Sequence, residues 1–521
     1  MGIPYRILAL LLLTWEASAQ EANALIAGDS SFIGAPGVKA RLTLSGVTAV
    51  AKMVAKTLAS EIAQADHIVT SPAVKLGQTQ MMANSPRLKL FNDVNQVTVD
   101  MVPIGALTAH ITNVNASVPF DVSGTFNGMP VSGEFELLSS GFGMDVTLSI
   151  KRNPRGNPLI TILSCRAIPP RAPLIVHGSA TARNDLVTQL QITLQQTANF
   201  DLMQAMIDAD KEIRRKARSR SRRAPAPGTL QAFISSNFNL SRAEGLVLDY
   251  GVVTSPTLSA RGIEMDSSGE ISAHNAPTPF GPRPIALSPV VGNEMFEIVV
   301  SDFVPNSFMY HGHRIGMFNT RVDPTTPHFG PTMRTTCDLN SGSLFCVGDL
   351  FPTLRDQFPD KELVFLFSTL KAPAVIVHKE NDGGIAFDLL GLIRVQQYDP
   401  VTKKETPIGE MEIQITAQMK MRITSKVVKG KVLLDNIFLR TRTPSVLVQE
   451  ELDDASLLSR EILQRMVNDI IKQGVPIPVH PLFRLKKPTM RLGDRSLILE
   501  TSFTLNRRLI NQLTAAHLSS A

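Results

Sequence analysis

The middle of the chain, Val247 to Val291, limits the fold most strongly because six of its residues are prolines. Proline fixes φ and lacks an N–H group, and it pushes the preceding residue toward extended geometry. We therefore predict an extended, semi-rigid linker from Asp266 to Ser288. The same order of elements, helix, alternating strands, helix and strand, is expected on each side, which predicts two domains of one architecture.

Composition supports two folded domains of about 200–250 residues each. The chain has 521 residues, of which 43% are hydrophobic and 19% charged. The net charge of +6 comes largely from one short arginine-rich segment. A surface of the nucleic-acid-binding kind is therefore not expected.

The N-terminus has the pattern of a secretory signal peptide. Arg6 precedes a short apolar run, Ile7 to Leu13, and Ala17-Ser18-Ala19 is typical of a cleavage site. An uncleaved anchor is disfavoured because the apolar run is too short to span a bilayer. We expect a soluble, secreted, extracellular protein that begins at Gln20.

A secreted chain permits disulfides and glycans. Cys337 and Cys346 flank a polar turn and are expected to pair, which leaves Cys165 over. The sequons at Asn115 and Asn239 are candidate glycosylation sites, with unused sequons as the alternative.

Apolar periodicity in the first half predicts a strand from Gly37 to Leu44, with Val38, Ala40, Leu42 and Leu44 on its buried face. A helix follows, and a meander of strands from Leu88 to Thr161 contains a hairpin signal at Asn127-Gly128. A second helix starts at Asp201. The two helices carry apolar stripes, which are Val47, Val50, Val54 and Leu58 in the first and Leu202 and Met206 in the second.

The second half opens with a strand from Glu294 to Val300 and a short helix capped by Ser301-Asp302 that carries Phe303 and Phe308. Asp349 is the expected N-cap of another short helix. Long alternating strands follow, and the last long helix has the stripe Leu458, Ile462 and Met466. Together the two halves predict an α+β protein.

Motifs of catalysis and metal binding are not found: the chain lacks G-x-S-x-G, a Walker loop, C-x-x-C and H-E-x-x-H. His311 and His313 form an H-x-H without a carboxylate or thiol beside it, so a polar loop is favoured over a metal site. We therefore expect no enzyme, no cofactor and no metal.

Five short motifs occur in one order along the chain. They are Pro36-Gly37-Val38 before a strand and helix, Asp249 to Val253, Val300 to Phe303 with Asn306 to Tyr310, Phe351-Pro352 with Gln357 to Pro359, and Gly474 to Pro478. In this order the chain resembles the family of bactericidal/permeability-increasing protein, lipopolysaccharide-binding protein and phospholipid transfer protein.

The resemblance implies a boomerang of two barrel-like domains, each a long twisted antiparallel sheet with amphipathic helices, joined through a central sheet. It also implies one apolar pocket for phospholipid acyl chains in each half. The N-terminal pocket would be lined by Val47, Val50, Val54, Leu58, Leu202 and Met206, and the C-terminal one by Phe303, Phe308, Leu458, Ile462 and Met466.

The chain departs from the family's pattern at two places. The family joins a cysteine that matches Cys165 to one on the second helix, but the range from Phe200 to Arg223 has no cysteine. Lipopolysaccharide-binding members carry lysines at the tip of the N-terminal barrel, whereas the range from Asn113 to Glu134 has no lysine or arginine.

Two functions follow from the resemblance. The first is a secreted lipid-binding or lipid-transfer protein without catalysis, whose partners are phospholipid or another acyl lipid and membrane or lipoprotein surfaces. The alternative is an innate-immune binder of anionic microbial lipids such as lipopolysaccharide. The expected segments are 1–19 signal peptide, 20–248 N-terminal lipid-binding barrel, 249–291 central sheet and proline-rich linker, and 292–521 C-terminal lipid-binding barrel.

The arginine-rich run ends in Arg220-Ser221-Arg222-Arg223 before a Pro/Gly tail. This pattern resembles the recognition site of furin-type proprotein convertases, with Arg220, Arg222 and Arg223 as the recognised residues. Two other interpretations stay open: a solvated helix end, and a cluster that holds anionic headgroups.

Overall fold

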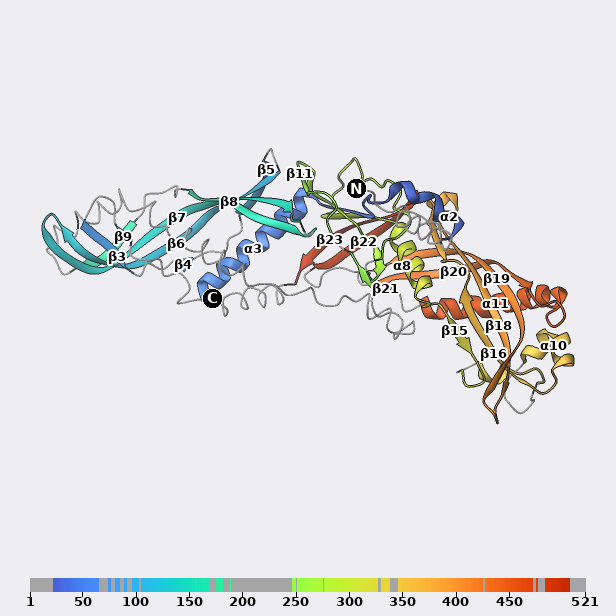
Figure 1. Cartoon of the computed structure of the whole chain (residues 1–521). Coiled ribbons are helices and arrows are strands. Elements are labelled where there is room, and N and C mark those ends of the chain that lie inside the picture. Colours follow the sequence, from blue (N-terminus) through green and yellow to red (C-terminus); the bar gives the residue numbers. More distant parts are fainter. Residues whose placement is uncertain are drawn as a thin grey trace, which may run out of the picture.

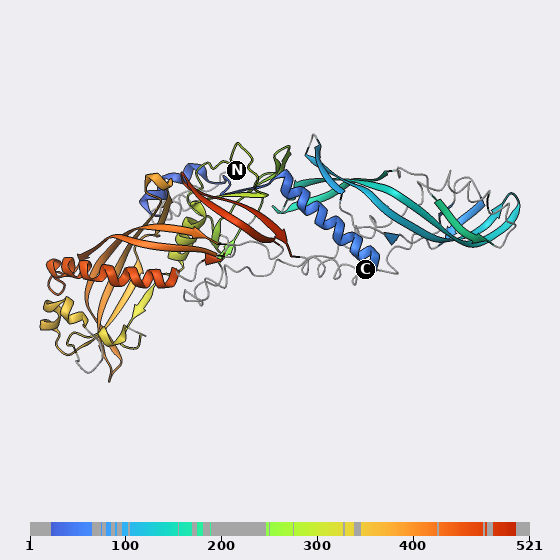
Figure 2. The same cartoon turned by 180° about the vertical axis from the view of Figure 1, so that it is seen from behind.

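The protein is elongated, with a large antiparallel sheet at each end and a smaller sheet between them (Figures 1 and 2). It is a mixed α+β structure, represented by a computed structural model. No helix in the described residues combines the length and the apolar composition needed to cross a bilayer. The structure describes residues 22–64, 74–75, 80–84, 89–90, 96–102, 105–154, 156–168, 175–180, 188, 246–249, 251–274, 276–326, 329–337, 345–424, 427–471, 475–476 and 483–506.

The N-terminal sheet is built around one long hairpin, β6 and β7. Asn127 and Gly128 connect the two strands with φ of 51° and 76°, the left-handed geometry of a type I′ turn, so the predicted hairpin is present. Its eight strands are β2 (Val74–Lys75), β3 (Gln80–Asn84), β4 (Lys89–Leu90), β5 (Gln96–Val102), β6 (Ala106–Phe126), β7 (Met129–Arg152), β8 (Pro158–Ile168) and β9 (Ile175–Ala180).

The central sheet joins segments from the two ends and the middle of the chain. Its six strands are, in spatial order, β11 (Thr257–Ser259), β12 (Gly262–Ser267), β1 (Val38–Leu42), β14 (Phe296–Ser301), β23 (Ser496–Leu505) and β22 (Phe483–Gly493). Every neighbouring pair is antiparallel. Helix α3 (Leu44–Gln64) starts directly after β1 and runs toward the N-terminal sheet (Figure 1).

The C-terminal sheet has seven strands: β15 (Thr320–Val322), β16 (Glu362–Thr369), β17 (Ala374–Val377), β18 (Ile385–Asp399), β19 (Lys404–Ile423), β20 (Val427–Thr441) and β21 (Val475–Pro476). Helix α11 (Gln449–Ile471) packs along β20, and two short helices, α9 (Val347–Leu350) and α10 (Pro352–Gln357), cover the distal end. The predicted disulfide between Cys337 and Cys346 is present, with a Cα–Cα distance of 5.4 Å.

Short elements fill the junction between the central and C-terminal sheets. Helix α8 (Phe303–Arg314) follows β14, and the N-terminal segment forms α2 (Ala24–Ala27) and a 3₁₀ turn, η1 (Gly28–Phe32). Strands β10 (Leu246–Leu248) and β13 (Ile271–Ala273) form a two-stranded sheet. Two more 3₁₀ turns, η2 (Gly330–Thr332) and η3 (Glu380–Asp382), lie in the C-terminal half.

Two predicted helix caps differ from the structure. Asp302 is the N-cap residue of α8 but makes no capping hydrogen bond, because its carboxylate is held by Arg495 and by the N–H of Val377. Asp349 is not an N-cap. It is the third residue of α9 and accepts a hydrogen bond from the backbone N–H of Cys346.

Candidate functional site

Helix α3 lies against the N-terminal and central sheets through the first part of its predicted stripe. Val47 is buried and packs with Val99, Leu107 and Ile263. Val50 is half-buried. The side chains of Val54 and Leu58, and all of Leu202 and Met206, lie outside the described residues, so the full lining of this pocket stays a prediction.

Helix α11 buries its first two turns against the C-terminal sheet. Leu452 and Ala455 are almost fully buried and belong to one core cluster with residues such as Leu363 and Met411. Helical spacing continues this stripe through Leu458, Ile462 and Met466. The side chains of those three residues are not among the described ones.

Phe303 and Phe308 both lie on α8, but in two different clusters. Phe303 packs at the junction with Phe280 and Tyr310, where Phe280 makes edge-to-face contacts with both rings at 5.9 Å. Phe308 packs edge-to-face against Phe318 at 6.3 Å. Neither phenylalanine belongs to the core cluster that holds the described residues of α11.

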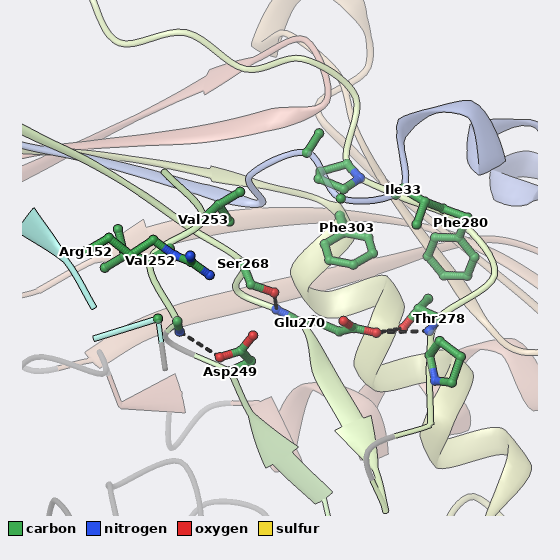
Figure 3. Close-up of a pocket in the computed structure, with 17 residues that line it drawn as sticks. Ile33, Arg152, Asp249, Val252, Val253, Ser268, Glu270, Thr278, Phe280 and Phe303 are labelled. Atoms are coloured by element: carbon green, nitrogen blue, oxygen red, sulfur yellow. Dashed lines mark hydrogen bonds between the residues drawn. The ribbon is translucent and has the colours of Figure 1, made fainter. Parts of the chain in front are cut away.

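A cavity of about 370 Å³ lies at the junction, which the sequence did not predict. This volume is at the lower end of the range of about 300–1,000 Å³ that is usual for small-ligand pockets. One wall is apolar, with Phe280, Phe303 and Ile33, and the opposite side carries Arg152 and Asp249 (Figure 3). Phe280, an aromatic residue inside the proline-rich segment, could have indicated this site. It was missed because the segment was predicted to be an extended linker, in which no side chain is expected to be buried.

A polar chain of three residues, of which Thr278 and His311 are buried, borders this cavity. Glu270 accepts hydrogen bonds from the backbone N–H and the hydroxyl of Thr278, at 3.0 and 2.5 Å (Figure 3). The Thr278 hydroxyl has only one hydrogen to donate, so Nε2 of His311, 3.0 Å away, must donate to its oxygen. Burial lowers the pKa of His311 from 6.5 to about 4, with a further contribution from the charge of Arg314. His311 is therefore neutral at pH 7.

A second buried network holds the junction together through charge. The guanidinium of Arg495 donates to Asp302 at 2.5 Å and to Asp29 at 2.8 Å, and Arg283 donates to the other oxygen of Asp29. Burial raises the pKa of the Asp302 carboxyl above its usual value, although Arg495 opposes this shift. The network joins η1, the proline-rich segment, the start of α8 and the turn between β22 and β23.

One charged residue of β1 is buried although it does not belong to the predicted buried face. Arg41 is only 1% exposed and forms ion pairs with Glu264 at 2.9 Å and Glu297 at 3.0 Å, whereas Val38 and Leu42 are only half-buried. Both carboxylates come from the neighbouring strands β12 and β14. The two ion pairs compensate the burial of the arginine charge in this central strand.

The histidine pair on α8 has hydrogen-bonding partners of its own. Nδ1 of His313 lies 2.5 Å from the hydroxyl of Thr369, and His311 faces Thr278. In the described part of the chain, the one group with three closely spaced metal-ligand atoms is Cys337, Cys346 and Asp349. Both sulfurs of that group are in the disulfide.

Other predicted sites are only partly described. Asn115 is exposed on β6, and its side-chain oxygen accepts a hydrogen bond from Gly141, so its glycosylation stays a prediction. Cys165 lies on β8 opposite Val146, but its side chain is not described. Asn239, Arg220, Arg222 and Arg223 lie outside the described residues, as does the predicted signal peptide.

The sequence is similar to known proteins. Residues 240–505 match the sequence model of the LBP / BPI / CETP family, C-terminal domain. A bactericidal permeability-increasing protein from Sebastes schlegelii is 22% identical over 382 residues, which cover 70% of this chain and 73% of that protein.

Two solved structures are also similar. The crystal structure of lipopolysaccharide binding protein is 19% identical, covers 90% of this chain and 99% of its own, and gives a TM-score of 0.45. Takeout 1 of Epiphyas postvittana is 12% identical, covers 29% of this chain and 77% of its own, and gives a TM-score of 0.23. Because the matched domain spans more than half of the sequence, the chain belongs to the LBP/BPI/CETP family of non-catalytic lipid-binding proteins.

Proposed function

We propose that this protein is a secreted lipid-binding or lipid-transfer protein that holds phospholipid acyl chains in apolar pockets, one in each half of a two-barrel boomerang. The observation that carries the proposal is the family match over residues 240–505, which include most of the central sheet and all of the C-terminal sheet. The predicted signal peptide and the disulfide between Cys337 and Cys346 support secretion.

The proposed N-terminal pocket lies in the barrel of residues 20–248, and the C-terminal pocket in the barrel of residues 292–521. Their linings are Val47, Val50, Val54, Leu58, Leu202 and Met206 in the first, and Phe303, Phe308, Leu458, Ile462 and Met466 in the second. Each half has a long amphipathic helix, α3 or α11, that packs its apolar side on an antiparallel sheet.

The free energy of acyl-chain burial is large enough to retain a lipid without catalytic groups. Two acyl chains remove on the order of 400 Å² of apolar surface from water, which is worth about 10 kcal/mol at about 25 cal/mol per Å². Ordering of the chains and loss of their freedom in the membrane reduce this gain. The remainder still favours a specific complex over free lipid in water.

Mass spectrometry of the purified protein tests the proposal. Under native conditions, protein from a secreting host should carry one or two phospholipids per chain, which denaturation releases and organic extraction identifies. Protein that is lipid-free as purified, and that stays lipid-free after incubation with phosphatidylcholine vesicles, contradicts the proposal.

Recognition of anionic microbial lipid is a second candidate, favoured by the net charge of +6 and by the name of the Sebastes schlegelii relative. The tip of the β6–β7 hairpin is not the expected binding site for such a lipid, because residues 113–134 contain no lysine or arginine. Affinity for lipopolysaccharide that falls steeply with salt supports the candidate. Affinity equal to that for a neutral lipid at every salt concentration contradicts it.

A further inference from the structure

The hairpin formed by β19 and β20 carries an unusual run of positive charge near its turn. From Ile413 to Leu434 the sequence has no aspartate or glutamate but five cations, Lys420, Arg422, Lys426, Lys429 and Lys431. Four of them, all except Lys426, lie in described parts of the two strands. We call these four the cationic face of the hairpin.

The strand register places these cations directly opposite one another. Lys420 is the Cα partner of Lys431, and Arg422 is the partner of Lys429. Directly paired residues point to the same side of a sheet, with Cβ atoms about 4.5–5.5 Å apart. All four residues are exposed, whereas Val432, one position along from Lys431, points into the core. The four cations therefore form one exposed cluster.

Such a cluster does not stabilise the fold, because like charges directly opposite one another are destabilising. Elsewhere on the same sheet exposed arginines have acidic partners: Arg394 pairs with Glu410, and Arg442 with Glu412. In the described residues no ion pair is found for any member of the cationic face. Arg394 and Arg442 thus have acidic partners within the chain, whereas none is found in the described residues for the cationic face. This difference indicates a partner outside the chain.

The cationic face lies next to the centre of the molecule. Val427 and Val428 at the start of β20 pair with β21, and Met421 of β19 packs in a cluster with Leu492 of β22 in the central sheet. Figure 1 shows β20 and β21 in the C-terminal sheet, on the side of that sheet that faces the central sheet. A surface bound here would contact the C-terminal sheet close to the central sheet.

We propose that the cationic face of the β19–β20 hairpin docks the protein onto anionic phospholipid membranes. The proposal rests on the proposed function, because a protein that loads acyl lipid must meet a lipid surface. Four cations on two adjacent strands match an array of headgroups better than one free phosphate. Each cation near an anionic membrane strengthens binding by about five-fold.

Vesicle co-sedimentation tests the docking surface. The variant Lys420→Gln/Lys431→Gln should bind vesicles of phosphatidylcholine with phosphatidylglycerol about 25-fold more weakly than wild type, from about five-fold per cation. The control Lys403→Gln/Lys404→Gln removes the same charge from two exposed residues at the other end of β19. It should bind like wild type, and salt should weaken wild type more than the first variant.

The proposal is wrong if the first variant binds vesicles as tightly as wild type, or if the control loses binding equally. A first variant that keeps its vesicle binding but loses binding to a sulfated polysaccharide would assign the cluster to that polymer instead. Soluble glycerol phosphate at the same phosphate concentration should not displace wild type from vesicles, and full displacement would assign the cluster to free phosphate instead.

Two further measurements are needed. The melting temperature distinguishes membrane docking from a structural role of the cations, and the amount of bound lipid tests the proposed function separately. The variant should melt at the same temperature as wild type or higher, and Lys420→Arg/Lys431→Arg should keep full vesicle binding. A lower melting temperature together with lost binding in the arginine variant contradicts the docking role. The amount of lipid bound per chain should be the same in the variant and the wild type. A wild-type protein without any bound lipid refutes the proposed function, but the vesicle binding of the two proteins can still be compared.

Discussion

Acid should weaken the junction between the central and C-terminal sheets through His311. This residue is 1% exposed and donates from Nε2 to Thr278, whose own hydroxyl hydrogen goes to Glu270. A second proton on the ring would place a charge in a buried site, with the charge of Arg314 nearby. Protonation therefore favours states in which His311 reaches water.

The sign and size of the effect follow from the two pKa values. His311 has a pKa of about 4 in the folded protein and 6.5 when exposed, so between these values the unfolded chain binds more protons. The contribution of neutral, buried His311 to the free energy of unfolding is fully present above pH 6.5 and is lost as the pH falls toward about 4. The loss amounts to about 3 kcal/mol, at about 1.4 kcal/mol per pH unit.

Asp302 acts in the opposite direction at the same junction. Burial raises its pKa above the usual value, so its contribution to stability is present at low pH and is lost as the pH rises through the folded value. A pH profile of the wild type alone mixes the two groups. The contribution of His311 is the difference between wild type and a variant that cannot titrate at this position.

Calorimetry of wild type and His311→Gln from pH 7.5 to 4 isolates that difference. Glutamine keeps a donor that can reach Thr278 and stays neutral throughout. We expect the wild type to lose about 3 kcal/mol more than the variant as the pH falls over this range. Parallel profiles for the two proteins would refute the buried, neutral state of His311.

Four other predictions concern single sites. Arg41→Ala removes the ion-pair partner of Glu297 and leaves Glu264 with the more distant Arg261, and should cost about 3–5 kcal/mol in urea unfolding; a cost below 1 kcal/mol contradicts the structural role of Arg41. Val54→Asp should abolish lipid loading of the N-terminal half and destabilise it, and normal secretion with full lipid content would mean that position 54 faces solvent. Thiol labelling of denatured, non-reduced protein should modify one cysteine per chain, Cys165, whereas no labelling points to an intermolecular disulfide. Denaturing gels of protein from convertase-competent cells test the candidate site: a cut after Arg223 supports processing, and a single full-length band excludes it.

Local signals were sufficient for the elements themselves. The Asn127-Gly128 turn, the alternation along β19 and the polar turn between Cys337 and Cys346 are each determined by residues close in sequence. Element ends were less accurate. Helix α11 begins at Gln449, well before Leu458, the first residue of its predicted stripe, because the side chain of Gln449 already binds the backbone of β20.

Contacts between distant segments could not be predicted from local pattern. The proline-rich segment was expected to be an extended spacer, but Thr278 and Phe280 are buried at the junction. Their burial depends on His311 and Phe303 of α8, which lie more than 20 residues away in sequence. The alternation rule likewise gave β1 an apolar buried face, because it cannot know that β12 and β14 supply carboxylates to Arg41.

The central sheet determines which parts of this chain depend on one another. Strand β1 lies between β12 and β14, with all five of its residues paired on both sides. An isolated N-terminal segment would leave β1 with two unpaired edges, and an isolated C-terminal segment would expose the facing edges of β12 and β14, which favours aggregation. It would also leave Glu264 and Glu297 without Arg41. The segment boundary expected at residue 248 therefore does not mark a place where the chain can be divided into two independently stable proteins.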